Sequence, residues 1–152
     1  MERIVGNILD VPIGFIVQGC NNQGKMGAGL ALAVKQRYQK GYNIYVDEWN
    51  YRKGFKLGDV QYIWVEHNKI ICNAITQQYY GRDGKRYVDY DAVRKAFQNV
   101  LEMAKVDNLP IHFPKIGCSL GGGDWNIVKN IINEVLGDHE CYCWVLSDKE
   151  IV

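Results

Sequence analysis

The sequence lacks the features of a membrane, secreted or strongly charged protein. No segment of its 152 residues approaches the roughly 18 consecutive apolar residues of a membrane-spanning helix. The apolar N-terminal stretch is interrupted by Asn7 and Asp10 and carries no signal-peptide cleavage pattern. With 18 basic and 17 acidic residues the formal net charge is +1, so bulk charge indicates neither a nucleic-acid nor a membrane partner. We therefore expect a cytoplasmic protein.

Metal-binding and disulfide patterns are missing as well. The cysteines are odd in number, include no CxxC pair and have no histidine-rich cluster near them. Most of them sit in apolar, strand-like runs, which is typical of buried thiols in a reducing compartment. We expect reduced cysteines, no metal and no cofactor. The five are Cys20, Cys72, Cys118, Cys141 and Cys143, and the last two alternate along a strand and share one face.

What the chain does contain is the alternating pattern of a single α/β domain, which we expect to span residues 1–152. Apolar or β-rich runs predict strands at Glu2–Val5, Gly14–Val17, Val60–Val65, Lys69–Thr76, Leu109–Phe113 and Cys141–Leu146. Helical spacing predicts helices at 29–38, Tyr42–Arg52, Tyr90–Lys105 and Asn126–Leu136, with Asp89 or Asp91 as the cap of the third. Strands alternating with helices, plus one hairpin turning at His67–Asn68, imply a mixed sheet covered by helices on both faces.

Two glycine clusters, Gly19–Gly29 and Gly117–Gly123, both lie between a predicted strand and a predicted helix. A helix N-terminus presents unpaired N–H groups, and glycines before it let an anion approach the backbone. One such loop could be an ordinary flexible turn, whereas two in equivalent positions favour a ligand that resembles a diphosphate. Neither loop is a P-loop, because Met26 stands where serine or threonine is required, and no GxGxxG pattern follows the first strand.

No catalytic constellation is evident from the residues alone. His112 lies in an apolar strand and reads as a satisfied core or edge histidine more readily than as a base. Asp124 stands at a predicted helix start, where a capping role weighs at least as much as a chemical one. Tyr79 and Tyr80 could equally wall a pocket or cover the sheet.

Four segments in order along the chain resemble a macrodomain: VGNIL, QGCNNQGKMGAGLA, PKIGCSLGGGDW and the final CWVL. The likeness covers almost the whole chain. It is closest to the branch of ADP-ribose 1″-phosphate phosphatases and terminal ADP-ribose protein glycohydrolases, including small bacterial and phage versions. The resemblance implies a three-layer αβα sandwich with a mixed, mostly parallel sheet and with ADP-ribose lying across its crest.

The resemblance also assigns ligand contacts. Asn7, with Ile8, matches the segment whose acidic side chain contacts the adenine amino group, and Asn21 matches the asparagine that holds the distal ribose. The loop along the diphosphate and distal ribose corresponds to Lys25, Met26, Gly27, Ala28 and Gly29. The second phosphate loop corresponds to Ile116, Gly117, Cys118, Ser119, Leu120, Gly121 and Gly122.

Three positions depart from the catalytic patterns of that branch. Gln77 occupies the place of the glycohydrolase lysine, Gly121 that of its acidic partner, and Gln18 that of a phosphatase histidine. We expect phosphate removal from ADP-ribose 1″-phosphate, with Asn21 and Asp124 as the candidate catalytic residues. The alternatives are a non-catalytic module that reads free or protein-linked ADP-ribose, and a glycohydrolase that removes ADP-ribose from glutamate side chains. The expected partner is ADP-ribose, a derivative of it, or an ADP-ribosylated protein.

Overall fold

The computed structural model describes all residues from 1 to 152. None of its helices combines the length and the apolar character that crossing a membrane requires. The elements follow in the order β1 (Glu2–Val5), the short 3₁₀ helix η1 (Ile8–Asp10), β2 (Gly14–Asn21), α1 (Gly29–Arg37), α2 (Gln39–Arg52), β3 (Val60–Glu66), β4 (Lys69–Gln77), α3 (Tyr90–Asp107), β5 (Ile111–Phe113), α4 (Trp125–Leu136) and β6 (Cys141–Val145).

The six strands form one sheet in the order β1-β6-β5-β2-β4-β3. Every neighbouring pair is parallel except β3 and β4, which form the antiparallel hairpin predicted from the sequence. Asn68 turns that hairpin with a φ of 55°, a left-handed conformation that asparagine tolerates well. The sheet is therefore mixed and mostly parallel, as expected.

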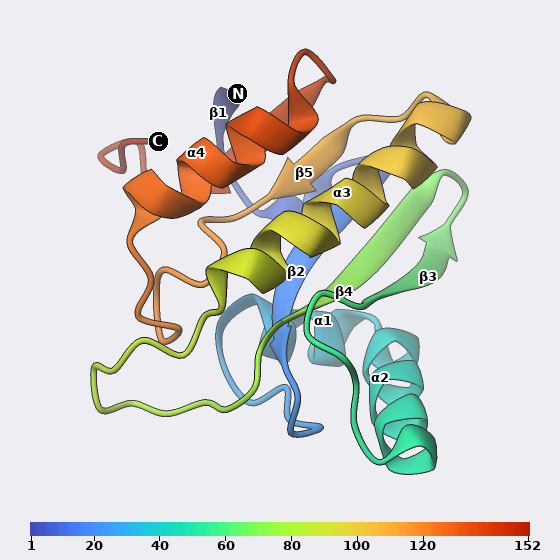
Figure 1. Ribbon diagram of the computed structural model, residues 1–152. Coiled ribbons are helices and arrows are strands. Elements are labelled where there is room, and N and C mark those ends of the chain that lie inside the picture. Colours follow the sequence, from blue (N-terminus) through green and yellow to red (C-terminus); the bar gives the residue numbers. More distant parts are fainter.

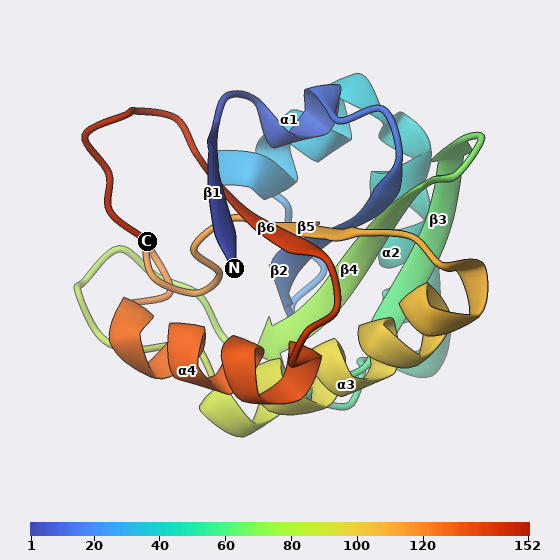
Figure 2. The same cartoon turned by 90° about the horizontal axis from the view of Figure 1, so that it is seen from above.

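The sheet is the middle of three layers (Figure 1). Seen along the sheet, α1 and α2 lie on one face, while α3 and α4 lie on the other (Figure 2). Phe15 and Val17 of β2 pack into the larger core under α3 and α4, whereas Ile16 joins the smaller core under α1. This alternation explains why β2 reads as a continuous apolar run: both of its faces are covered. The predicted αβα sandwich is confirmed.

Capping residues set several element boundaries. Of the two aspartates proposed as the cap of α3, Asp89 is the N-cap, since its carboxylate accepts a hydrogen bond from Ala92 N at 2.9 Å. The same helix ends at Asn108, whose φ of 52° is left-handed. Strand β2 extends four residues beyond its predicted end at Val17, because the polar residues that follow do not have the apolar pattern of a buried strand. Those residues pair with β4 and so extend the sheet up to the loops.

Three parallel neighbours, β5, β2 and β4, end at the same edge of the sheet. Their connections to the following helices span residues 22–28 after β2, 78–89 after β4 and 114–124 after β5. The chain passes from β2 to helices on one face and from β4 and β5 to helices on the other. A crevice at the carboxyl ends of strands that lead to opposite faces is where ligands bind in open α/β sheets.

Candidate functional site

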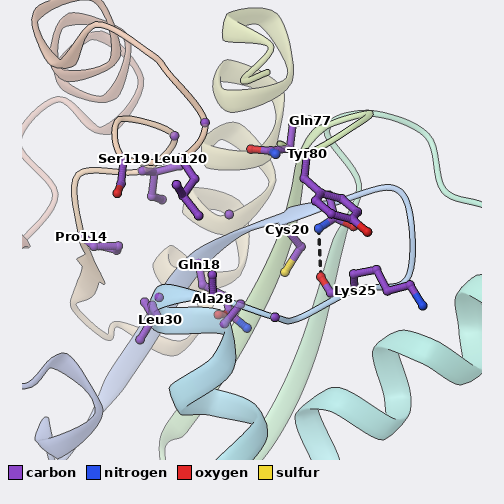
Figure 3. A pocket seen from close by; sticks show the side chains of 18 of the residues that line it. Gln18, Cys20, Lys25, Ala28, Leu30, Gln77, Tyr80, Pro114, Ser119 and Leu120 are labelled. Atoms are coloured by element: carbon purple, nitrogen blue, oxygen red, sulfur yellow. Dashed lines mark hydrogen bonds between the residues drawn. The ribbon is translucent and has the colours of Figure 1, made fainter. Parts of the chain in front are cut away.

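A cavity of about 520 Å³ opens at this edge, lined by 21 residues from the three connections, the strand ends and the first turn of α1. Its volume lies in the range that encloses a nucleotide-sized ligand. Figure 3 shows Ser119 and Leu120 facing Ala28 and Leu30 across the pocket. The two glycine loops identified in the sequence therefore face each other across one cleft.

The first wall is the turn that enters α1. Ala28 is the N-cap residue and provides no side-chain hydrogen bond, so the first N–H groups of the helix are left for another acceptor. Gly29 has a φ of +58°, a conformation that favours glycine. A Cβ on Gly27 would meet no atom within 4 Å, so this residue borders open space. The turn thus presents bare backbone to the cleft at the positive end of a helix dipole.

Asn21 is held rigidly at the start of the same loop. Its Nδ2 donates to Lys25 O at 2.9 Å, and its Oδ1 accepts from Gln23 N at 2.9 Å. The Tyr45 hydroxyl donates to the backbone oxygen of Asn21 at 2.5 Å and so holds this end of the strand in place. One N–H of the amide is still free to donate to a ligand oxygen.

The second wall, residues 114–124, is tightly packed. Gly117 has a φ of +72°, and a Cβ there would overlap Val88. A Cβ on Gly121 would lie 2.6 Å from Gly117 O. Tyr87 N and Val88 N both donate to Gly121 O, at 2.7 and 3.1 Å, which joins this wall to the connection after β4. Glycine is required here because a Cβ would overlap the Val88 side chain at Gly117 and the backbone at Gly121, and the second wall is consequently preformed.

The charge lining the cleft is entirely positive. Lys25, Arg82 and Lys115 line it, none of them forms an ion pair, and no aspartate, glutamate or histidine is among the lining residues. Such a cleft favours an anion with several charges. Arg82 and Lys115 are not among the predicted contacts, although Lys115 comes just before the second glycine cluster and Arg82 lies in the polar loop after β4.

The cleft contains no activated nucleophile. Cys20 is its only thiol, and burial raises the pKa of that thiol well above the ordinary value, so the reactive thiolate is disfavoured. Gln18 and Gln77 also line it, but amides do not exchange protons near neutral pH.

The structure places Asp124 away from the cleft, as the N-cap of α4. Its carboxylate accepts from Asn126 N at 2.9 Å, and its own N–H donates to the Tyr90 hydroxyl at 3.0 Å. It is not among the lining residues, whereas Asn21 is. The two candidate catalytic residues thus do not both line the cleft, and the contacts of Asp124 are those of a helix cap.

Ten of the expected ligand contacts line the cleft: Asn21, Lys25, Gly27, Ala28, Gly29, Ile116, Gly117, Ser119, Leu120 and Gly121. Met26 does not, because its side chain packs into the small core around Tyr45. The Cys118 thiol turns back to Ile116 O at 3.2 Å. Gly122 lies behind the cleft, where a Cβ would overlap the backbone of Lys85.

Asn7 and Ile8 lie outside this volume, at the short helix η1. Asn7 is exposed and caps η1, with its Oδ1 accepting from Leu9 N at 3.0 Å. Its Nδ2 has no hydrogen-bond partner within the chain, and Ile8 is buried beneath it. Their contact with adenine stays a prediction.

His112 has the core role that the sequence favoured. Its side chain is 3% exposed, and its Nδ1 accepts from Trp144 Nε1 at 2.9 Å. Its Nε2 lies 3.1 Å from Ile13 O and therefore carries the ring proton. Burial lowers the pKa of this imidazole, which agrees with the neutral form that these two contacts need.

Comparison with known proteins identifies the family. Residues 17–132, more than three quarters of the chain, match the Macro domain family model. The chain belongs to the Macro domain family.

Curated relatives of this macrodomain act on ADP-ribose derivatives. It is 26% identical over 145 residues to a DNA ADP-ribosyl glycohydrolase of Thermus aquaticus, covering 90% of this chain and 38% of that protein. It is 41% identical over 46 residues to an ADP-ribose 1″-phosphate phosphatase of Aspergillus oryzae, covering 30% of this chain and 23% of that protein. The chain thus matches well under half of the length of either relative.

Solved structures share the whole fold. A protein of unknown function from Bacteroides thetaiotaomicron superposes with a TM-score of 0.85 at 28% identity, covering 94% of this chain and 96% of that one. A macrodomain protein from Streptomyces coelicolor superposes with a TM-score of 0.80 at 25% identity, covering 95% and 97%. The macrodomain fold therefore spans essentially all of the chain.

Proposed function

We propose that this macrodomain binds ADP-ribose across its cleft and hydrolyses a derivative of it, removing phosphate from ADP-ribose 1″-phosphate. One observation carries the proposal. Two backbone-lined loops face each other across a cleft whose side-chain charges are all positive. The two curated relatives, which act on ADP-ribose derivatives, support the choice of ligand.

The binding step follows from the two walls. The uncapped start of α1 and the loop around Gly117 provide N–H donors on opposite sides of the cleft, which suits the two phosphates of a diphosphate. Asn21 has one free amide N–H near the first loop, which suits an oxygen of the distal ribose.

The cations favour a ligand with more charge than ADP-ribose itself. The backbone groups already match the diphosphate, and Lys25, Arg82 and Lys115 are free of ion pairs. A phosphate on the distal ribose would add negative charge beside them. Hydrolysis of that ester yields ADP-ribose and inorganic phosphate, and the chain assists by orienting the ester and by stabilising the charge on its oxygens.

Phosphate release from ADP-ribose 1″-phosphate tests this function. The purified chain should release phosphate well above the rate of a Gly27→Glu variant, which serves as the control for contaminating phosphatases because its cleft is blocked. Calorimetric binding of ADP-ribose is measured on the same samples. Equal phosphate release by both proteins would contradict the hydrolase proposal, and absence of ADP-ribose binding would contradict the proposal as a whole.

A second candidate is a reader module that binds ADP-ribose without chemistry. The observation that favours it is that no carboxylate, histidine or thiolate lines the cleft. Binding of ADP-ribose without any phosphate release would select this function. ADP-ribose esterified to a glutamate peptide and ADP-ribosylated DNA belong in the same assay, because release of ADP-ribose from either would select a glycohydrolase.

A further inference from the structure

One buried oxygen in the cleft has no hydrogen-bond partner. Gln18 lines the cleft and is 1% exposed, yet its Oε1 accepts no hydrogen bond. Burying an amide oxygen without a partner costs roughly 1–3 kcal/mol, so such an atom needs an explanation. Figure 3 shows Gln18 on the side of the pocket lined by Ala28 and Leu30.

The nitrogen of the same amide begins a chain of buried amides that runs over three neighbouring strands on one face of the sheet. Gln18 Nε2 donates to Asn73 Oδ1 at 2.7 Å, and Asn73 Nδ2 donates to Gln61 Oε1 at 3.2 Å. Gln61 Nε2 then donates to the carboxylate of Glu48 on α2. Gln18, Asn73 and Gln61 are direct neighbours in register on β2, β4 and β3, so the strand pairing itself holds the chain together.

The far end of this chain fixes its direction. A carboxylate only accepts hydrogen bonds, so the Glu48 end requires Gln61 to donate. Two backbone carbonyls demand the same direction: Gln61 Nε2 lies 3.2 Å from Ile44 O, and Asn73 Nδ2 lies 3.3 Å from Gly41 O. If the side-chain amides of Gln61 and Asn73 were flipped, their oxygens would face three acceptor oxygens: the Glu48 carboxylate, Ile44 O and Gly41 O. Gln18 must therefore give its N–H to Asn73, which leaves the buried oxygen of this cleft-lining residue without a donor.

We propose that Gln18 Oε1 accepts a hydrogen bond from a ribose hydroxyl of the bound ligand, which makes Gln18 a specificity-determining residue. This rests on the proposed binding of ADP-ribose. Diphosphate oxygens are acceptors and cannot satisfy a carbonyl oxygen. The resemblance predicts that the adenine amine contacts Asn7, which lies outside the cleft volume. Hydroxyl groups of the two riboses are the donors that remain.

The same oxygen also disfavours binding of the ligand with a phosphate group next to Gln18. A phosphate oxygen next to Gln18 would meet a second acceptor without a proton between them, which costs affinity. Gln18 thus holds a ribose over the floor of the cleft and leaves the phosphates to the two glycine loops. Glu48, which lies on α2 beside the edge strand β3, acts as a positioning residue because its charge helps to set the direction of the chain.

A cycle of protein and ligand variants tests this role. Gln18→Met removes the acceptor at nearly constant volume, and ADP-ribose analogues each replace one ribose hydroxyl by hydrogen. By calorimetry, wild type should lose about three- to tenfold in affinity for one of the analogues, the usual worth of one hydrogen bond. Gln18→Met should bind ADP-ribose that much more weakly and should not distinguish it from the same analogue. The analogue concerned shows which of the two riboses donates.

A rescue variant separates ligand contact from structural support. Neutral glutamic acid has one O–H donor and one carbonyl acceptor, as the chain requires, and burial raises the pKa of that acid. Gln18→Glu should therefore bind ADP-ribose nearly as wild type does at pH 5 and lose affinity as the pH rises, whereas wild type stays flat. This variant also serves if Gln18→Met does not fold.

Thr76→Val provides the matched control. Thr76 Oγ1 is also buried without a partner, but Thr76 does not line the cleft, so its loss should leave the hydroxyl dependence unchanged. If wild type binds ADP-ribose and Gln18→Met retains the full dependence on every hydroxyl, or if Gln18→Glu binds equally from pH 5 to pH 9, the inference is overturned while the proposed function stands. If wild type does not bind ADP-ribose at all, the proposed function fails first.

Discussion

A negative charge at Gly27 tests whether the first glycine loop is a binding surface. Gly27 borders open space and has an ordinary backbone conformation, so Gly27→Glu introduces no clash or strain into the fold. The free energy of unfolding without ligand should stay within about 0.5 kcal/mol of wild type, as for other surface substitutions. A neighbouring glycine would be a poorer choice, because Gly29 has a φ of +58° and its replacement would strain the turn.

The loss of affinity can be estimated from Coulomb's law. A carboxylate about 6 Å from the two charges of a diphosphate is repelled by roughly 1.4 kcal/mol in a water-like dielectric and by roughly 5.5 kcal/mol at an effective dielectric of 20. The affinity for ADP-ribose should therefore fall at least about tenfold. Gly27→Gln adds nearly the same volume without the charge and separates the steric from the electrostatic part.

Isothermal titration with ADP-ribose at two salt concentrations is the assay. The difference between the Glu and Gln variants should shrink at high salt, because ions screen charges that are open to solvent. Wild-type affinity in Gly27→Glu would mean that no anion passes this turn. The assignment of the cleft as a diphosphate site would then be wrong.

Three other substitutions probe the adenine end, the second wall and the core. Asn7→Ala should weaken ADP-ribose binding by about 1 kcal/mol and abolish any preference over the hypoxanthine analogue, as measured by calorimetry; an intact preference would place the adenine elsewhere. Gly122→Ala should lower the free energy of urea unfolding by about 1–3 kcal/mol, since φ is +69° and the Cβ would overlap the Lys85 carbonyl, while Gly27→Ala, at an unstrained open position, should not. Folding lowers the pKa of His112, so the unfolded chain binds more protons than the folded one. The free energy of unfolding should therefore fall as the pH drops below about 6.5, with a slope of at most about 1.4 kcal/mol per pH unit. His112→Gln should remove that part of the slope, and an unchanged slope would refute the neutral assignment.

Local signals in the sequence were sufficient for the fold. The apolar run of β2, the alternation in β3 and the periodicity of α3 each reflect burial of one or two faces of the element. Such burial shows in the order of apolar and polar residues within the element itself. The polar end of β2, Gln18 to Asn21, was missed as strand because its pairing partners lie more than 50 residues away on β4. Long-range pairing overrides local propensity there.

The site was only partly predictable for the same reason. Glycine clusters are visible in the sequence itself, so residues around Gly27 and Gly117 can be predicted as ligand contacts, and the structure places them in the lining of the cleft. Asp124 is acidic and lies close to the second loop, but its carboxylate accepts a hydrogen bond at the start of α4, which is the capping role that the sequence also indicates. Gln18 read as a lost catalytic residue, and its link to Glu48 through Asn73 and Gln61 became visible only once three strands were in register.

Thermal denaturation with a panel of nucleotides shows whether the cleft between the two glycine loops is a specific site for ADP-ribose. A ligand that binds only the folded state stabilises it by RT ln(1 + [L]/Kd), about 2.7 kcal/mol at a concentration 100 times Kd. For a domain of this size that corresponds to a rise of roughly 5–10 °C in Tm. ADP-ribose should produce such a rise, and AMP and NAD at the same concentration should produce much smaller ones. Equal shifts with all three ligands, or no shift with ADP-ribose, would contradict the account.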